Sequence, residues 1–301
     1  MNTDRLHVYY TVDERYIEPA KVSIYSFLKY NRLPITVYLV NCKSSNEYMR
    51  FFQDFQITTV PLYVNLLNQK YSECKYRYCF NEIMSKHLVI SKICSKYDYA
   101  LHLDADTYFN QRIDFENIDM IGYDCGGTYY KYESNKISPQ CGFTIFKTHS
   151  GLDSSKLETL LAEYYKQFPP SKQCFENPEY TGVDEKIIPY FYKKIKRLDQ
   201  VKYNSTTQCE SDTVMYHMDS SMKPWHFVIN PYVDNAQLLR RIDSLQKWYN
   251  YMNEIKDYLD QKFIHNCEMT KCLCEKLKIY LLNRNGREIN KNLLLYKPKI
   301  C

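Results

Sequence analysis

Residues 99–106 read Tyr-Ala-Leu-His-Leu-Asp-Ala-Asp, an apolar run of strand length that ends in two carboxylates. Short apolar runs bounded by polar residues are typical of buried strands. Two carboxylates at a strand end can point into one crevice and share a hard divalent cation, which prefers oxygen ligands. Most short D-x-D patterns are solvated turn acids, so the preceding apolar strand is what favours a metal site here.

The chain around this run alternates strand-like and helical patterns. The elements expected before the acidic pair are strands at 7–11, 35–40, 57–64 and 99–103 and helices at 20–28 and 81–96. Further strands are expected at 140–147 and 213–218. Strands that alternate with helices predict an α/β fold with a mostly parallel central sheet flanked by helices. Ligands of such sheets bind outside the carboxyl ends of the strands.

The composition is that of a globular chain able to bury a core. Of 301 residues, 45% are hydrophobic and 25% charged, which suits one large domain with a modest extension. The net charge of +5 is spread along the chain, and this argues against a nucleic-acid partner, which needs a concentrated basic face. Glycine occurs only 7 times, and neither G-x-G-x-x-G nor a Walker loop is present.

The sequence predicts a cytoplasmic protein with no membrane partner. Its apolar runs fall short of the roughly 18 residues of a membrane span, and the first residues lack the apolar core of a signal peptide. In that compartment the 12 cysteines are expected as reduced thiols. The set His265, Cys267, Cys272 and Cys274 has zinc-ligand residue types without the paired spacing of a zinc site, so packed or exposed thiols are the favoured interpretation.

The pattern changes after residue 235. Apolar residues at three- and four-residue steps from Leu238 to Phe263 predict one amphipathic helix of about seven turns. We therefore divide the chain into a domain of residues 1–235 and a helical extension of residues 236–301. An apolar stripe this long needs cover, either from the protein's own core or from a second subunit. The aromatic cluster Trp248, Tyr249 and Tyr251 favours core packing or a dimer interface over a covalently modified tyrosine.

A second motif lies at residues 217–225, which read His-Met-Asp-Ser-Ser-Met-Lys-Pro-Trp. His217 can be a third ligand for a borderline metal such as Mn²⁺. Lys223 can reach a diphosphate as a point charge. Pro224 and Trp225 would stiffen and bury the turn that follows. Taken singly, a core histidine and a surface lysine are the more common interpretations.

The two motifs together resemble the glycogenin-like glycosyltransferases of family 8, which are metal-dependent enzymes with a GT-A fold that use sugar nucleotides. Residues 217–225 resemble the family pattern H-x-x-G-x-x-K-P-W, with Ser220 at the usual glycine, and Asp104-Ala105-Asp106 resembles its metal-binding D-x-D. Weaker matches occur in the same order at 8–16, 140–143, 182–185 and 198–204. The resemblance covers residues 7–226, about three quarters of the chain.

The resemblance implies a retaining hexosyltransferase with a UDP-sugar donor. It implies that Asp104, Asp106 and His217 hold Mn²⁺, with Mg²⁺ as the alternative, and that Lys223 acts on the departing diphosphate. It further implies that Asp184 faces the sugar as acceptor-orienting group or stabiliser of the transition state. The other donor-binding residues that it implies are Tyr10, Thr11, Asp13, Tyr16, Lys86, Ala105, Gln140, Gly142, Glu185 and Ser220. Of these, Thr11 and Asp13 would bond the uracil and Tyr16 would cover it.

Several departures from the family pattern leave the substrates open. Ser220 adds a side chain where glycine lets the backbone approach the diphosphate. Gln140 and Glu185 change polar contacts to the donor sugar, so the identity of the sugar does not carry over from the family. The expected donor is a UDP-sugar of glucose or a close relative. Thr181 stands where glycogenin itself has a second acid, which argues against a self-glucosylating enzyme.

The acceptor, a saccharide or a protein, is not given by the sequence. Family resemblance adds an expectation of homodimers. The alternatives are a catalytically inactive GT-A scaffold and a UDP-sugar hydrolase. Against the scaffold stands the presence of all four residues Asp104, Asp106, His217 and Lys223.

Overall fold

The computed structural model of the protein describes residues 1–43, 46–64, 80–93, 96–131, 137–150, 154–167, 188–206, 209–218, 222–227 and 234–283. The chain forms two compact units. The sheet unit comprises Met1–Ile17, Arg32–Ala105 and Ile113–Gln200, and the helical unit comprises Glu18–Asn31, Asp106–Arg112 and Val201–Cys301. The chain passes from one unit to the other between Ala105 and Asp106, within the acidic pair. The predicted division at residue 235 stays a prediction.

The sheet unit is built on a seven-stranded mixed sheet in the order β3-β2-β1-β4-β7-β6-β8. Its strands are β1 (Leu6–Val12), β2 (Ile35–Val40), β3 (Thr58–Leu62), β4 (Tyr99–Leu103), β6 (Cys125–Lys131), β7 (Ile137–Lys147) and β8 (Ile195–Arg197). Strand β7 is antiparallel to β4 and β6, and the other neighbours in the sheet are parallel. The predicted mostly parallel α/β sheet is therefore confirmed.

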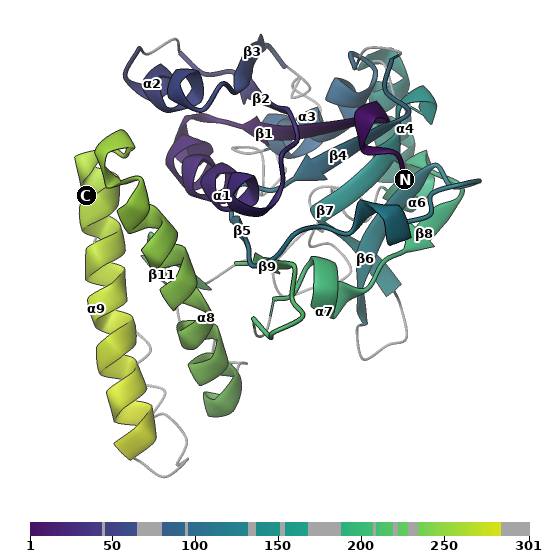
Figure 1. Ribbon diagram of the computed structural model, residues 1–301. Helices are drawn as coiled ribbons and strands as arrows, with labels where there is room; N and C mark the ends of the chain where they lie inside the picture. The colour runs from purple at the N-terminus through teal and green to yellow at the C-terminus, as the bar shows by residue number, and fades with distance from the viewer. Residues whose placement is uncertain are drawn as a thin grey trace. The chain divides into compact units, whose positions relative to one another are not determined.

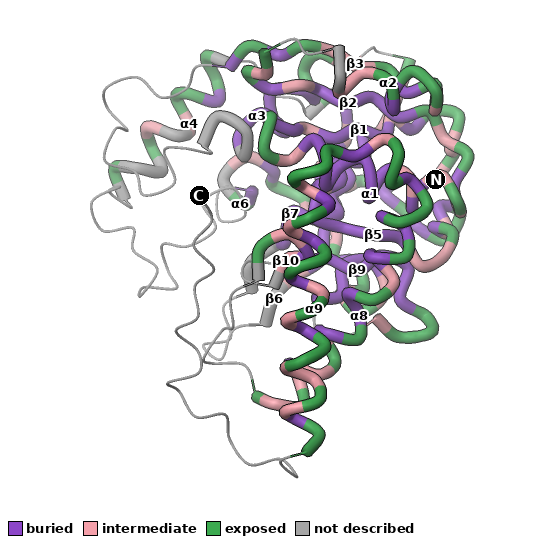
Figure 2. The backbone as a smooth tube through the Cα atoms, turned by 90° about the vertical axis from the view of Figure 1, so that its left-hand side faces the viewer, coloured by how far each residue is buried: buried purple, intermediate pink, exposed green. Residues whose placement is uncertain are grey.

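The helices of the sheet unit cover an apolar core. They are α2 (Asn46–Asp54), α3 (Phe80–Ile90), α4 (Ser154–Gln167) and α6 (Ile188–Phe191). Helix α3 packs on β1 and β2 (Figure 1), where Met84 and Leu88 join Tyr9, Val40 and Phe146 in one buried cluster. Figure 2 shows these strands as largely buried. Because β1 and β4 run parallel, the residues that follow them meet at one sheet edge, and these are the predicted nucleoside-binding and metal-binding segments.

Helix α3 ends earlier than the sequence pattern predicts. We expect a helix over residues 81–96, but α3 stops at Ile90. The next backbone bonds, from Lys92 to Val89 and from Ile93 to Ile90, are tight three-residue turns. Ser91 contributes to this ending because its hydroxyl donates to the Leu88 carbonyl at 2.8 Å, a local bond of the kind that competes with helix continuation.

Among the described residues, the helical unit combines three long helices with two short antiparallel sheets of two strands each. Its elements are α1 (Ile17–Tyr30), β5 (Thr107–Phe109), α7 (Gln200–Tyr203), β9 (Met215–His217), β10 (Met222–Lys223), β11 (His226–Phe227), α8 (Asn235–Glu254) and α9 (Gln261–Asn283). Strand β5 pairs antiparallel with β9, and β10 with β11. Helices α8 and α9 lie side by side (Figure 1).

The single helix predicted over residues 236–263 is wrong, because two helices occupy this stretch. Helix α8 ends at Glu254, and α9 begins at Gln261 after a short 3₁₀ turn. Asp260 starts the new helix by accepting the Phe263 N–H at 3.0 Å. The buried ion pair of Lys21 with Glu18 holds the turn in place, since Lys21 Nζ donates to the Tyr258 carbonyl at 2.8 Å.

The apolar stripe of α8 is covered by the chain itself. Its residues Leu238, Ile242, Leu245, Trp248 and Met252 are all buried. In addition, the Tyr108 hydroxyl of β5 donates to the Ser244 carbonyl at 2.7 Å, and Tyr251 of α8 donates to the Phe109 carbonyl at 3.0 Å. The sequence leaves two ways to bury this stripe, in the protein's own core or against a second subunit. For α8, the structure shows burial in the protein's own core. Tyr249 and Tyr251 are buried in this core, which agrees with the core packing favoured for the aromatic cluster.

The cysteines of the described residues are free thiols, several of them buried as small apolar side chains. Cys267 and Cys274 belong to this buried group, and among the described residues no potential metal-binding group includes them or His265. None of the helices in the described ranges has the length and apolar character needed to cross a lipid bilayer.

Candidate functional site

Asp106 and His217 are held together by the backbone of the helical unit. The antiparallel β5–β9 pair sets Thr107 opposite His217, and the Met218 N–H donates to the Asp106 carbonyl at 2.9 Å. The His217 N–H donates to the Ser205 carbonyl at 2.8 Å on the other side of β9. As a result, His217 Nε2 lies 3.3 Å from Asp106 Oδ1. The two residues are 7% and 8% exposed.

Lys223 completes this cluster. Its Nζ lies 2.5 Å from Asp106 Oδ2, so the two carboxylate oxygens face two different basic groups. Burial by itself would raise the pKa of Asp106, but the Lys223 ammonium, and after it His217, hold the pKa well below its usual range. Asp106 is therefore a buried carboxylate that stays ionised at neutral pH.

The β10–β11 hairpin presents Lys223, and the C-terminal helices anchor that hairpin. Lys223 pairs with His226 across the turn. The Trp225 ring packs against Trp248 of α8 and Phe263 of α9, with ring centroids 5.6 and 5.9 Å apart. Lys223 Nζ lies 6.0 Å from the centroid of the Trp225 ring. Pro224 and Trp225 are predicted to bury the turn after Lys223. The packing of Trp225 onto helices α8 and α9 accounts for this burial.

Asp104 lies at the end of β4 in the sheet unit. Its N–H donates to the Gly142 carbonyl at 3.1 Å, which fixes the strand end against β7. Its Oδ1 lies 3.7 Å from Lys86 Nζ and 3.7 Å from His102 Nδ1. Lys86 is only 3% exposed, unlike the solvated lysine that is usual on a helix. Asp104 thus faces two nitrogen groups of the sheet unit.

His102 is a site residue that the sequence reasoning did not single out. It is 1% exposed, and its Nε2 lies 3.3 Å from Thr11 Oγ1, while its Nδ1 lies 3.4 Å from the Cys141 carbonyl oxygen. It therefore links Thr11, near the end of β1, with the acidic end of β4. The available signal was its position two residues before Asp104, which places both on the same face of an extended strand.

The residues predicted to hold the nucleoside lie along β1 and just after it. Tyr10 is fully buried, whereas Thr11 and Tyr16 are partly exposed. Asp13 is buried, accepts the N–H groups of Arg15 and Tyr16, and forms an ion pair with the Arg15 guanidinium. This arrangement orders the loop after β1 and leaves Thr11 and Tyr16 as the partly exposed groups.

The remaining predicted residues lie partly inside and partly outside the described ranges. Gln140 is fully buried on β7, where its Oε1 accepts the Thr128 hydroxyl at 3.3 Å, and Ala105 is also buried. Gly142 contributes its carbonyl to Asp104, as described above. Asp184, Glu185 and Ser220 lie outside the described residues.

The donor set fits a divalent cation that accepts both oxygen and nitrogen. Asp106 and His217, with Asp104 two residues earlier in the chain, supply two carboxylates and one imidazole. Carboxylates suit Mg²⁺ and Mn²⁺, and an imidazole ligand favours the softer Mn²⁺. The ionised state of Asp106 meets the requirement that a ligand be deprotonated.

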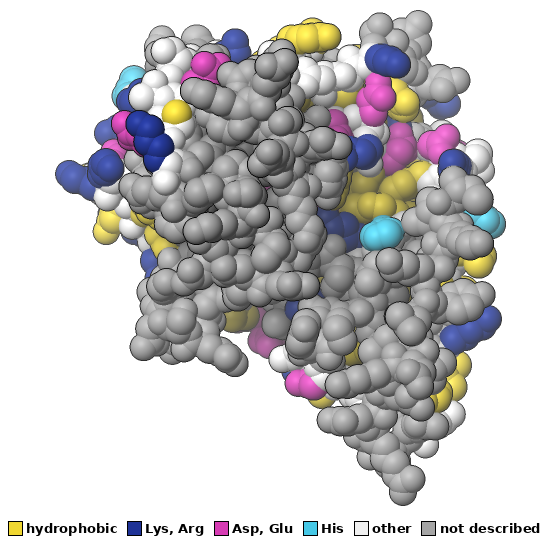
Figure 3. Space-filling model, turned by 180° about the vertical axis from the view of Figure 1, so that it is seen from behind, with side chains coloured by type: hydrophobic (Ala, Val, Ile, Leu, Met, Phe, Trp, Pro, Cys, Tyr) yellow, Lys and Arg dark blue, Asp and Glu magenta, His cyan; other side chains and the backbone are white. Residues whose placement is uncertain are grey.

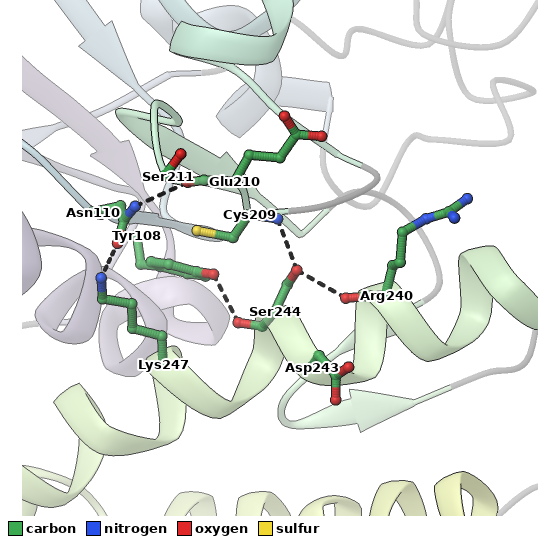
Figure 4. A pocket seen from close by; sticks show the side chains of 9 residues that line it. All are labelled: Tyr108, Asn110, Cys209, Glu210, Ser211, Arg240, Asp243, Ser244 and Lys247. Atoms are coloured by element: carbon green, nitrogen blue, oxygen red, sulfur yellow. Dashed lines mark hydrogen bonds between the residues drawn. The ribbon is translucent and has the colours of Figure 1, made fainter. Parts of the chain in front are cut away.

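A separate cavity of about 410 Å³ lies in the helical unit between β5, residues 209–211 and α8 (Figure 4). Ser244 lies at its centre, accepting the Cys209 N–H at 2.9 Å and donating to the Arg240 carbonyl at 2.9 Å. Lys247 donates to the Asn110 side chain across the same space. These polar groups bond to one another, so the contacts join α8 to Asn110, which follows β5, and to Cys209.

Comparison with known proteins connects this fold to glycosyltransferases. No protein-family model matches the chain, and no curated protein sequence matches it significantly. Among solved structures, the galactosyltransferase LgtC, in complex with donor and acceptor sugar analogues, matches with a TM-score of 0.54 at 11% identity, covering 73% of this chain and 89% of LgtC. An active-site mutant of LgtC matches with a TM-score of 0.59 at 11% identity, covering 83% and 95%.

A third similar structure is the glycosyltransferase GlyE of Streptococcus pneumoniae. It matches with a TM-score of 0.53 at 13% identity and covers 95% of this chain and 66% of GlyE. Identities this low carry the fold and not the substrates. The expected fold is thereby confirmed, and this chain has the GT-A fold of the glycosyltransferases that its two motifs resemble.

Proposed function

We propose that the protein is a metal-dependent, retaining glycosyltransferase that moves a sugar from a UDP-sugar donor to an acceptor. One observation carries the proposal: Asp106, buried and ionised, lies against His217 and Lys223 in a chain with a glycosyltransferase fold. A buried charged cluster of this kind is expensive to maintain without a function.

In this proposal, Asp104, Asp106 and His217 hold one Mn²⁺ or Mg²⁺. When bound, the ion neutralises charge that develops on the departing UDP. Asp106 and His217 keep their relative positions through the β5–β9 backbone bonds, so these two ligands are held near each other before the ion arrives. Asp104 is joined to Asp106 through a single buried residue, Ala105, which supports its place in the same ligand set.

Lys223 acts on the leaving group in the same proposal. Its ammonium would contact the diphosphate and strengthen that contact as the sugar–phosphate bond breaks, which favours the transition state over the ground state. Trp225 fixes the hairpin that carries Lys223 by packing on α8 and α9. The C-terminal helices thereby support the hairpin that carries Lys223.

The sheet unit supplies the donor contacts in the proposal. Thr11 and Asp13 bond the uracil, Tyr16 covers its apolar face, and Lys86 with Gln140 and Gly142 lies toward the donor sugar. Asp184 remains the proposed acid that faces the sugar, with Glu185 and Ser220 as further donor contacts. Retention of the anomeric configuration rests on the family resemblance.

The donor sugar is proposed to be glucose or a close relative, and the acceptor a saccharide or a protein. A homodimer and a cytoplasmic location also stay predictions. On the face drawn in Figure 3, the Lys and Arg side chains of the described residues lie singly or in small groups between acidic and apolar ones. The net charge of +5 is spread along the sequence, which favours a sugar nucleotide over a nucleic acid as the proposed partner.

The proposal is tested by incubating the purified protein with a panel of UDP-hexoses and UDP-pentoses in Mn²⁺ and measuring UDP release with and without saccharide acceptors. A transferase releases UDP from one donor in a metal-dependent reaction that an acceptor accelerates, and NMR of the product shows the donor's anomeric configuration. Release that no acceptor accelerates indicates a hydrolase. UDP binding without any release indicates the inactive scaffold.

A further inference from the structure

Lys223 contacts the carboxylate of Asp106, which is proposed to bind the metal ion. Its Nζ is 2.5 Å from Asp106 Oδ2, closer to the carboxylate than His217 Nε2, which is 3.3 Å from Oδ1. The proposed transferase needs this ammonium on the diphosphate. A divalent cation on Asp106 and the Lys223 ammonium on the same carboxylate are like charges a few ångströms apart in a buried site, where charge repulsion is weakly screened.

Asp106 needs a positive partner when no cation is bound. It is 8% exposed, and a buried ionised carboxylate without a counter-charge is strongly unfavourable. The Lys223 ammonium carries a full positive charge and lies closer to the Asp106 carboxylate than His217 Nε2 does. Lys223 therefore stabilises the cluster in the metal-free protein.

The Lys223 ammonium can also move away from Asp106. Its four-carbon side chain rotates about single bonds, so the ammonium can change place by several ångströms while the backbone stays fixed. The backbone of Lys223 is held by pairing with His226 and by the packing of Trp225 on Trp248. A change of side-chain rotamer is then sufficient to release Asp106, and no movement of the hairpin is required.

We propose that Lys223 is an internal substitute for the metal ion, which neutralises Asp106 in the metal-free protein and is displaced by a divalent cation toward the diphosphate. This inference rests on the proposed function and concerns the regulation of its site. It has two consequences. Lys223 competes with the cation, so it weakens metal binding in the absence of nucleotide. A diphosphate that captures the displaced ammonium strengthens metal binding, and by linkage the metal strengthens diphosphate binding to the same degree.

The test is calorimetry of Mn²⁺ binding to the purified protein, without nucleotide and with saturating UDP. Without nucleotide, Lys223→Met is expected to bind Mn²⁺ about tenfold more tightly than wild type, the size of a typical coupling between two sites. UDP is expected to tighten Mn²⁺ binding in wild type about tenfold and to have a smaller effect in Lys223→Met. Lys223→Arg keeps the charge and should stay within about threefold of wild type without nucleotide. Lys262→Met, at an exposed position of α9, is the matched control and should resemble wild type.

Thermal unfolding gives a second readout that does not depend on activity. In a metal chelator, Lys223→Met should unfold at a lower temperature than wild type, because Asp106 has lost its counter-charge, and Mn²⁺ should raise its unfolding temperature more than that of wild type. Equal or weaker Mn²⁺ binding by Lys223→Met, with wild type still binding Mn²⁺ through Asp106, overturns the inference and leaves the proposed function standing. If wild type binds no Mn²⁺ even with UDP, the metal-dependent function fails as well.

Discussion

His217 Nε2 lies 3.3 Å from Asp106 Oδ1, and the pairing of Thr107 with His217 in the β5–β9 ladder holds the two side chains at that separation. The two residues come from chain segments that meet only in the folded protein. A carboxylate and an imidazole fixed in this way form two thirds of the proposed ligand set. Each of the following predictions tests one part of this arrangement or of the packing that supports it.

Replacement of His217 by Ala should weaken Mn²⁺ binding more than Mg²⁺ binding. Imidazole is a better ligand for the softer ion, while Mg²⁺ relies on oxygen ligands, which the substitution leaves in place. Calorimetry of both ions with the variant checks this. His265→Ala, at an exposed position of α9, serves as the control. An equal loss of affinity for the two ions would count against His217 as a ligand.

Replacement of Lys223 by Met should lower kcat by a larger factor than it weakens UDP binding under saturating Mn²⁺. The reason is that the proposed contact strengthens as charge develops on the leaving diphosphate, so the transition state loses more than the ground state. Steady-state kinetics with calorimetry of UDP checks the ratio. Loss of UDP binding with a normal kcat would assign Lys223 to nucleotide recognition instead.

Replacement of Trp248 by Ala should lower the free energy of unfolding by about 3–5 kcal/mol, the usual range for removing a buried tryptophan. Trp248 is 0% exposed and packs on Trp225 and Phe263. Urea denaturation followed by circular dichroism measures the change. The neighbouring exposed substitution Gln246→Ala should stay within about 0.5 kcal/mol of wild type. A loss in Trp248→Ala no greater than that control would mean that α8 is not part of the core.

Acid should destabilise the protein through His7. Burial, and after it the charge of Lys96, lowers the pKa of His7 from 6.5 to about 4. The folded protein thus keeps His7 neutral while the unfolded chain protonates it, so stability is lost as the pH falls from about 6.5 to about 4. The His7 ring lies 4.9 Å from the Tyr97 ring, a place that a phenylalanine ring can occupy.

His7→Phe should therefore lose less unfolding free energy than wild type between pH 7 and pH 5, by up to about 2 kcal/mol. Denaturant titrations at the two pH values measure the difference. His265→Phe, at an exposed position of α9, is the control for the substitution of a histidine by phenylalanine. If His7→Phe and wild type lose the same stability on acidification, His7 is not the group responsible.

The sequence predicts the strands of the fold more accurately than its helix ends. The strands at 35–40 and 99–103 have the predicted bounds. Each is a mainly apolar run that is buried on both faces of the sheet, and such runs are recognised from the sequence. The single helix predicted over residues 236–263 is two helices in the structure. The spacing of apolar residues does not reveal the break, because it continues from one helix to the next when both face the same core. The contacts that stop α8, of Lys21 with the Tyr258 carbonyl and of Asp260 with Glu18, are long-range and cannot be read from local spacing.

The site is predicted in its residue types more than in its contacts. Asp106, His217 and Lys223 follow from their two motifs, and the structure brings these three together in the helical unit. The direct bond of Lys223 to Asp106 depends on the tertiary position of the β10–β11 hairpin, which no local pattern gives. His102 is missed because a histidine in an apolar strand is most often a satisfied core residue.

The central claim is that Asp106 is a ligand of a catalytic metal ion. The most direct test is UDP release from the preferred UDP-sugar in saturating Mn²⁺ by wild type, Asp106→Asn and the exposed control Asp212→Asn. The account predicts that Asp106→Asn reduces turnover by about 10²–10³-fold or more, because it removes a charged ligand from the ion that stabilises the leaving group, while Asp212→Asn stays near wild type. Near-wild-type UDP release by a folded Asp106→Asn protein would contradict the account.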